Sequence, residues 1–93
     1  MSMLQTISIT VTGRVQGVFY RQSAKEKALS LGITGKVINL PGGNVQVIAT
    51  GTKEQLELLA EWCKQGPSKA VVTGVELKDL PLQLFHDFII IRF

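Results

Sequence analysis

The sequence predicts an α+β fold, in which a five-stranded antiparallel sheet carries two helices on one face. Three observations support this prediction. In several short segments apolar residues alternate with polar ones, which is typical of strands. In two other segments apolar residues recur at helical spacing. The segments follow one another in the order β-α-β-β-α-β with a terminal strand added, which is the order of a split β-α-β arrangement.

Residues 4–12 form the first predicted strand. Apolar β-branched residues occupy one of its faces, and threonines and a serine occupy the other, so we expect one buried and one solvated face. After a glycine-containing loop, helical spacing predicts a helix over residues 22–31. The run Ser-Ala-Lys-Glu at 23–26 has the pattern of a capping box, and the glycine that follows the segment would end the helix.

Residues 34–40 and 44–50 are the second and third predicted strands. The Pro-Gly-Gly run between them favours a turn, so we expect the two strands to form a hairpin. The second predicted helix follows at once, and its first residues, Thr-Lys-Glu-Gln at 52–55, match a capping box. Cys63 lies at helical spacing from the apolar residues of this helix, so we interpret it as a core residue rather than a reactive thiol.

Residues 70–80 and 88–93 are the last two predicted strands, with a loop over residues 81–87. The earlier of the two alternates in the manner of a strand, with Val71, Thr73, Val75 and Leu77 on one face. The segment 88–93 is almost continuously apolar, so its pattern does not indicate which face is buried.

The length and composition favour one small globular domain. The chain has 93 residues, which is sufficient for one core, so we expect residues 1–93 to form a single domain. Hydrophobic residues make up 45% of the chain, which is enough to fill the space between a sheet and a helical layer. The net charge is +3 and no run of basic residues occurs, which favours a small anionic ligand over a nucleic acid.

The sequence also indicates the cellular compartment of the protein. Cys63 is the only cysteine, so no intrachain disulfide can form, which fits a reducing environment. No apolar run reaches the roughly 18 residues that a membrane span needs, and the N-terminus lacks the charged and apolar regions of a signal peptide. We therefore expect a cytoplasmic protein without membrane contact, and a monomer as the default.

The loop between the first strand and the first helix has the composition of an anion-binding site. Gly13 and Gly17 let the backbone turn tightly and bring its N–H groups close to a ligand. The helix that follows directs its positive end at the same place. Arg14 and Arg21 frame the loop, and a phosphate is the natural ligand. On these features alone, an ordinary strand–helix connection with a solvated arginine is the alternative.

Two motifs resemble the signatures of the acylphosphatase family. Residues 13–21 read Gly-x-Val-Gln-Gly-Val-x-x-Arg, and residues 35–45 read Gly-x-Val-x-Asn-x-x-x-Gly-x-Val. They occur in the expected order and at the expected separation, and the resemblance covers essentially the whole chain. It implies a ferredoxin-like α/β sandwich whose last strand pairs at an edge beside the second. It also implies hydrolysis of acyl phosphates to a carboxylate and inorganic phosphate.

The resemblance assigns catalytic roles to Arg21 and Asn39. Arg21 would grip the phosphate, since a guanidinium is always charged and its fork matches two phosphate oxygens. Asn39 would hold the attacking water, because a carboxamide both donates and accepts without repelling the phosphate. The resemblance further implies that the phosphate is bound by the backbone amides of Val15, Gln16, Gly17, Val18, Phe19 and Tyr20. Without the motifs, Arg21 could lie in solvent and Asn39 could be an ordinary turn residue.

We expect neither a metal ion nor a cofactor. No cluster of His, Cys, Asp and Glu has the spacing of a metal site, and we interpret His86, in the late loop, as a surface residue. Neither Ser23 nor Cys63 belongs to a recognisable nucleophile–base pair, so we do not expect a phosphorylated intermediate. A small acyl phosphate is the expected substrate, and inorganic phosphate or sulfate is the expected bound anion.

Two other functions are compatible with the sequence. The first is an anion-binding module without catalysis, since a related domain occurs within larger carbamoyl-transfer proteins. The second is a binder of single-stranded RNA, because RNA-recognition domains share the sheet topology. Those domains present aromatic residues on their middle strands, whereas the corresponding strands here carry Thr, Ser, Gln and Asn. We therefore expect no nucleic-acid partner.

Overall fold

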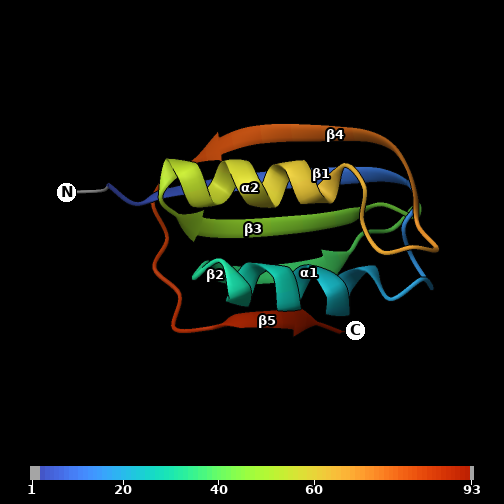
Figure 1. Ribbon diagram of the computed structural model, residues 1–93, viewed down its shortest axis with the longest axis horizontal. Coiled ribbons are helices and arrows are strands. Elements are labelled where there is room, and N and C mark those ends of the chain that lie inside the picture. The colour runs from blue at the N-terminus through green and yellow to red at the C-terminus, as the bar shows by residue number, and fades with distance from the viewer. Residues whose placement is uncertain (1–2, 93) are drawn as a thin grey trace.

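The computed structural model describes residues 3–92 and has two layers, a five-stranded sheet and a pair of helices on one of its faces (Figure 1). Helix α1 packs over one half of the sheet and α2 over the other half. The strands lie in the order β4-β1-β3-β2-β5. The elements are β1 (Gln5–Arg14), α1 (Tyr20–Ser30), β2 (Thr34–Asn39), β3 (Val45–Gly51), α2 (Lys53–Cys63), β4 (Val71–Leu80) and β5 (Phe88–Ile91).

The sheet is mixed, so the prediction of a purely antiparallel sheet is wrong at one edge. Strand β5 pairs with β2 in the parallel sense, and the other neighbours are antiparallel. The path of the chain explains the difference. Strand β4 ends with Leu80 opposite Thr6, at the end of the sheet where β1 and β2 begin. The connection 81–87 crosses this end, so β5 starts level with the start of β2 and must run beside it in the same direction (Figure 1).

The predicted position of the last strand is confirmed, because β5 lies at the edge beside β2. The structure also shows which face of β5 is buried, which the sequence pattern did not indicate. Phe88 is fully buried and Ile90 packs against the core, whereas Ile89 is exposed. Phe93, which the prediction included in this strand, lies outside the described residues.

The second face of β1 is less solvated than its alternation predicts. Thr6 and Thr50 are both buried, and their hydroxyls lie 2.6 Å apart. The hydroxyl of Thr50 donates to the carbonyl oxygen of Gln83 at 2.7 Å, and the backbone N–H of Gln83 donates to the hydroxyl of Thr6 at 2.9 Å. The connection 81–87 therefore covers one end of this face, and the threonines there bond to it instead of to water.

The core lies between the sheet and the helices, and Cys63 is part of it. Its side chain is fully buried, and burial raises the pKa of the thiol to about 12, so it stays neutral at physiological pH. The hydroxyl of Tyr20, at the start of α1, donates to the carbonyl oxygen of Cys63 at 2.7 Å. The tyrosine ring packs against Trp62 with 5.4 Å between ring centroids. The interpretation of Cys63 as a core residue is confirmed.

The two helices begin differently. Thr52 caps α2 as predicted, with its hydroxyl accepting from the N–H of Gln55 and its own N–H bonded to the Gln55 side chain. Helix α1 begins at Tyr20 rather than near residue 22, and no side chain caps it. The expected capping box at 23–26 is wrong, because Ser23 already lies inside the helix and its N–H bonds the carbonyl oxygen of Phe19. Within residues 3–92, neither helix is long and apolar enough to cross a membrane.

Gly35, at the start of β2, is expected to tolerate no side chain. Its φ is +148°, and a Cβ placed there would overlap the carbonyl oxygen of Ile48 on the neighbouring strand. We predict that Gly35→Ala lowers the free energy of unfolding, measured in urea, by about 3 kcal/mol. Gly42→Ala is the control, since Gly42 also has a positive φ but open space around it, and should cost only about 1 kcal/mol. Equal losses would show that the contact with β3 is not the cause.

Candidate active site

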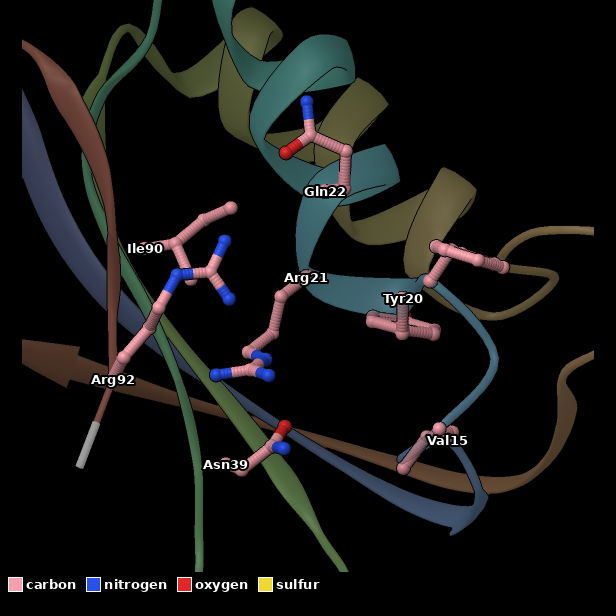
Figure 2. A pocket seen from close by; sticks show the side chains of 9 residues that line it. Val15, Tyr20, Arg21, Gln22, Asn39, Ile90 and Arg92 are labelled. Atoms are coloured by element: carbon pink, nitrogen blue, oxygen red, sulfur yellow. The ribbon is translucent and has the colours of Figure 1, made fainter.

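A pocket of about 440 Å³ opens at one end of the sheet, where the β1–α1 loop, the start of α1, the end of β2 and the end of β5 meet (Figure 2). It brings Arg21 and Asn39 together, although 18 positions separate them in the chain (39 − 21). No aspartate, glutamate or histidine is among its lining residues, which are Val15, Gly17, Phe19, Tyr20, Arg21, Gln22, Asn39, Ile90 and Arg92.

The backbone of the β1–α1 loop has the conformation of an anion cradle. Gly17 and Phe19 both have left-handed backbone angles, with φ of 74° and 63°, and they alternate with residues of ordinary φ. Such alternation turns successive N–H groups toward one concave side, which suits a negatively charged oxygen. Val15 and Val18 are buried and hold the loop to the core. The loop is therefore anchored to the core at these two positions.

The uncapped start of α1 adds to this cradle. The first N–H groups of a helix have no partner within the helix and carry its positive dipole end. In α2 the Thr52 capping box satisfies such groups, but in α1 the residue before the helix, Phe19, accepts no side-chain cap bond. The backbone N–H groups of α1 thus remain for a ligand, in the position where the sequence predicts a phosphate.

Arg21 lies in the first turn of α1 with its guanidinium directed into the pocket toward Asn39 (Figure 2). Its Nη1 donates to the carbonyl oxygen of Ile91 on β5 at 3.3 Å. Neither Arg21 nor Arg92 forms a salt bridge with any carboxylate among residues 3–92. A cation at the positive end of a helix is electrostatically unfavourable, and an anion bound between the two would reverse this. No carboxylate of the described residues therefore compensates the charge of the pocket.

Asn39, the last residue of β2, contributes an acceptor without a partner. Its Oδ1 is buried and forms no hydrogen bond with residues 3–92, the part of the chain that the structure describes. Buried polar atoms are nearly always hydrogen-bonded, and an unsatisfied one costs roughly 1–3 kcal/mol. The carboxamide faces the same pocket as the Arg21 guanidinium (Figure 2). A donor that enters this pocket, such as a water molecule, would satisfy it.

Gln16 joins the cradle to the β2–β3 hairpin. Its Nε2 donates to the carbonyl oxygens of Leu40 at 2.9 Å and of Asn44 at 2.8 Å. Leu40 directly follows Asn39, so the two bonds fix the loop relative to the residue on the opposite wall of the pocket. The sequence predicts a role only for the backbone of Gln16, and the contribution of its side chain was missed. Neither Gln16 nor Val18 is among the lining residues.

Two further lining residues, Ile90 and Arg92, come from the end of β5. No sequence pattern pointed to them, because the apolar run does not indicate which face of this strand is buried or where along β2 it pairs. His86 is exposed, as predicted. Within residues 3–92, no group of three or more His, Cys, Asp and Glu side chains is placed to hold a metal ion.

We predict that Gln16→Leu lowers the free energy of unfolding by about 1–3 kcal/mol, because it removes two hydrogen bonds between the loop and the hairpin, each worth about 0.5–1.5 kcal/mol. Urea unfolding measures the change. Gln65→Leu makes the same substitution at an exposed site and should change stability by less than about 0.5 kcal/mol. If Gln16→Leu lowers the free energy of unfolding no more than this control, the Gln16 side chain does not stabilise the contact between the loop and the hairpin.

Comparison with known proteins gives the same family as the motifs. The family model described as Acylphosphatase matches residues 7–90. An acylphosphatase from Marinobacter nauticus is 51% identical over 81 residues, covering 86% of this chain and 88% of that protein. An acylphosphatase from Thermus thermophilus is 54% identical over 79 residues, covering 82% and 90%. The solved structure of an acylphosphatase from Coxiella burnetii is 38% identical with a TM-score of 0.90, covering 94% of this chain and 92% of that one.

These matches span nearly all of the sheet and both helices, and they include the loop and the hairpin that form the pocket. The middle strands β1 and β3 carry no aromatic residue, so the alternative of an RNA-binding sheet gains no support. The family predicted from the two motifs is confirmed, and the chain belongs to the acylphosphatase family of enzymes, which hydrolyse acyl phosphates.

Proposed function

We propose that acyl phosphates are hydrolysed in the pocket between the β1–α1 loop, Arg21 and Asn39, without a metal ion or cofactor. The proposal rests on two groups in the pocket wall that have no partner among the described residues. The guanidinium of Arg21 has no carboxylate partner among residues 3–92, and the buried Oδ1 of Asn39 has no donor there. A phosphate and a water molecule are the two ligands that would satisfy this pair.

The phosphate binds in the cradle of the β1–α1 loop. The backbone N–H groups of residues 15–20 and the positive end of α1 supply fixed partial charges, and Arg21 supplies a full one. Its planar fork contacts two phosphate oxygens at once, which fixes the orientation of the group as well as its charge. The bond from Arg21 to the carbonyl oxygen of Ile91 holds the guanidinium in place before the substrate arrives. Little reorganisation is then needed to reach the transition state.

The water is positioned by Asn39. Its Oδ1 accepts a hydrogen bond from the water, whose oxygen attacks the phosphorus atom opposite the acyl oxygen. The bond between phosphorus and the acyl oxygen breaks, and the electron pair leaves with the carboxylate. No carboxylate or histidine of residues 3–92 lines the pocket, so the proton of the water passes to a phosphoryl oxygen or to solvent. A carboxylate is a good leaving group, so the reaction needs no side-chain acid to protonate it.

We also propose that the chain acts as a single domain, as a monomer and in the cytoplasm, and that inorganic phosphate or sulfate occupies the cradle as a product or product-like anion. The lone cysteine supports the compartment, since Cys63 is a buried free thiol and makes no disulfide. The substrate is a small molecule that fits a pocket of about 440 Å³.

We predict that Arg21→Gln lowers kcat/KM for benzoyl phosphate by on the order of 10² or more, because the phosphate loses the guanidinium proposed to grip it in the cradle. The kcat/KM of Arg21→Lys should lie between the values of this variant and the wild type, since lysine keeps the charge but lacks the planar fork of the guanidinium. The assay is hydrolysis in the presence of a chelator, with inhibition by inorganic phosphate as a second readout. Lys78→Gln, an equal loss of charge on exposed β4, is the control. Undiminished turnover by Arg21→Gln would refute the assignment.

Asn39→Ala should separate activity from stability. We predict that kcat falls on the order of 10² while KM changes little, because the water is lost but the phosphate ligands remain. The free energy of unfolding should fall by less than about 1 kcal/mol, since the variant also removes an unsatisfied buried acceptor. Asn44→Ala, in the neighbouring turn, is the control for effects on the hairpin. A rise in KM with unchanged kcat would place Asn39 in substrate binding and contradict its role toward the water.

A further inference from the structure

Arg92 is the second cation of the pocket, and the proposed reaction does not use it. It directly follows Ile91, the last residue of β5, and lines the pocket together with Arg21. Side chains alternate along a strand, so position 92 falls on the face of Phe88 and Ile90, which is turned toward the helices. Figure 2 shows the guanidinium groups of both arginines in the pocket, one extending from α1 and the other from the end of β5. Side-chain positive charge therefore enters the pocket from two walls.

A hydrogen bond brings the two arginines together. Nη1 of Arg21 lies 3.3 Å from the carbonyl oxygen of Ile91, whose carbonyl carbon is bonded to the backbone nitrogen of Arg92. Like charges repel each other, and the positive end of α1 adds to this repulsion. Neither arginine forms a salt bridge with a carboxylate among residues 3–92. An exposed arginine at the end of an edge strand would avoid the repulsion by turning away, yet Arg92 faces the pocket.

The charge of a phosphoryl group gives the second arginine a use. Such a group carries about −1.5 to −2 charges at neutral pH. Arg21 supplies one positive charge, and the N-terminus of a helix is equivalent to about half of one. These two sources are enough for a monoanion but fall short of a dianion of the same shape. A second guanidinium on the facing wall removes the shortfall.

We propose that Arg92 attracts the second negative charge of the phosphate, so that the pocket selects dianionic over monoanionic tetrahedral oxyanions. The inference rests on the anion-binding role in the proposed function and adds the ionisation state in which the ligand is bound. Arg92 is exposed, so water screens its attraction. One unit charge at about 4 Å in water changes a binding constant roughly fivefold. Arg92 acts through its charge, so a lysine in its place retains the selection.

The test measures the dissociation constants of sulfate and methanesulfonate by NMR titration of the backbone amides of residues 15–20. Both anions are tetrahedral and keep their charge near neutral pH, but sulfate is a dianion and methanesulfonate a monoanion. In Arg92→Gln the preference for sulfate should fall about fivefold at low ionic strength, and added salt should reduce this difference from the wild type. Arg92→Lys should keep the wild-type preference. Lys78→Gln, which removes an equal charge from an exposed position on β4, should keep it as well.

The outcomes separate this inference from the hydrolytic function. An unchanged preference in Arg92→Gln would overturn the inference even if both anions bound more weakly, since Arg92 would then affect only the structure of the pocket. An equal fall in Lys78→Gln would overturn it too, because the net charge of the chain would be the cause. A wild-type protein that binds sulfate no more tightly than methanesulfonate would also overturn it. Wild-type protein that prefers sulfate but does not hydrolyse benzoyl phosphate would overturn the hydrolytic function and retain Arg92 as an anion-binding residue.

Discussion

The geometry of the pocket depends on the hydrogen bonds of Gln16. The phosphate cradle and the residue proposed to hold the water lie on different segments, and the sheet alone does not fix the distance between them. The side chain of Gln16 reaches from the cradle to two carbonyl oxygens of the β2–β3 turn, those of Leu40, the residue after Asn39, and of Asn44. A second bond, from Arg21 to the carbonyl oxygen of Ile91, fixes the helix to the edge strand. Three segments distant in sequence are thereby held at one end of the sheet.

The parallel pairing of β5 is part of the same arrangement. Because the chain crosses from β4 to the far edge at the end where β2 begins, β5 runs toward the pocket and ends beside it. An antiparallel β5 would end at the opposite end of the sheet, and its last carbonyl group and Arg92 would lie far from Arg21. The bonds of Thr6 and Thr50 to Gln83 hold the crossing connection in place. Polar groups on the open face of the sheet thus help to position the pocket at its other end.

Local sequence patterns predicted most of the fold. The errors lie where contacts between distant segments determine the local structure. The capping box at Thr52 and the burial of Cys63 follow from residues close in sequence, and both predictions are confirmed. The direction of β5 was wrong, because strand patterns do not record the path of a connection. The start of α1 was also wrong, since Ser23 matches a capping box as well as Thr52 does. The ligand-binding role proposed for the loop would explain why a left-handed Phe19 takes that place.

Three locally unfavourable features meet in the pocket. They are a cation at the positive end of a helix, a buried acceptor without a donor at Asn39, and a left-handed phenylalanine. Elsewhere the same chain avoids such costs, as the capped start of α2 demonstrates. Their coincidence is meaningful because they arise on three separate elements, α1, β2 and the loop. A bound phosphate would offset the first, and a water held by Asn39 would offset the second. The strain of this fold is concentrated at the pocket that is proposed to bind the ligand.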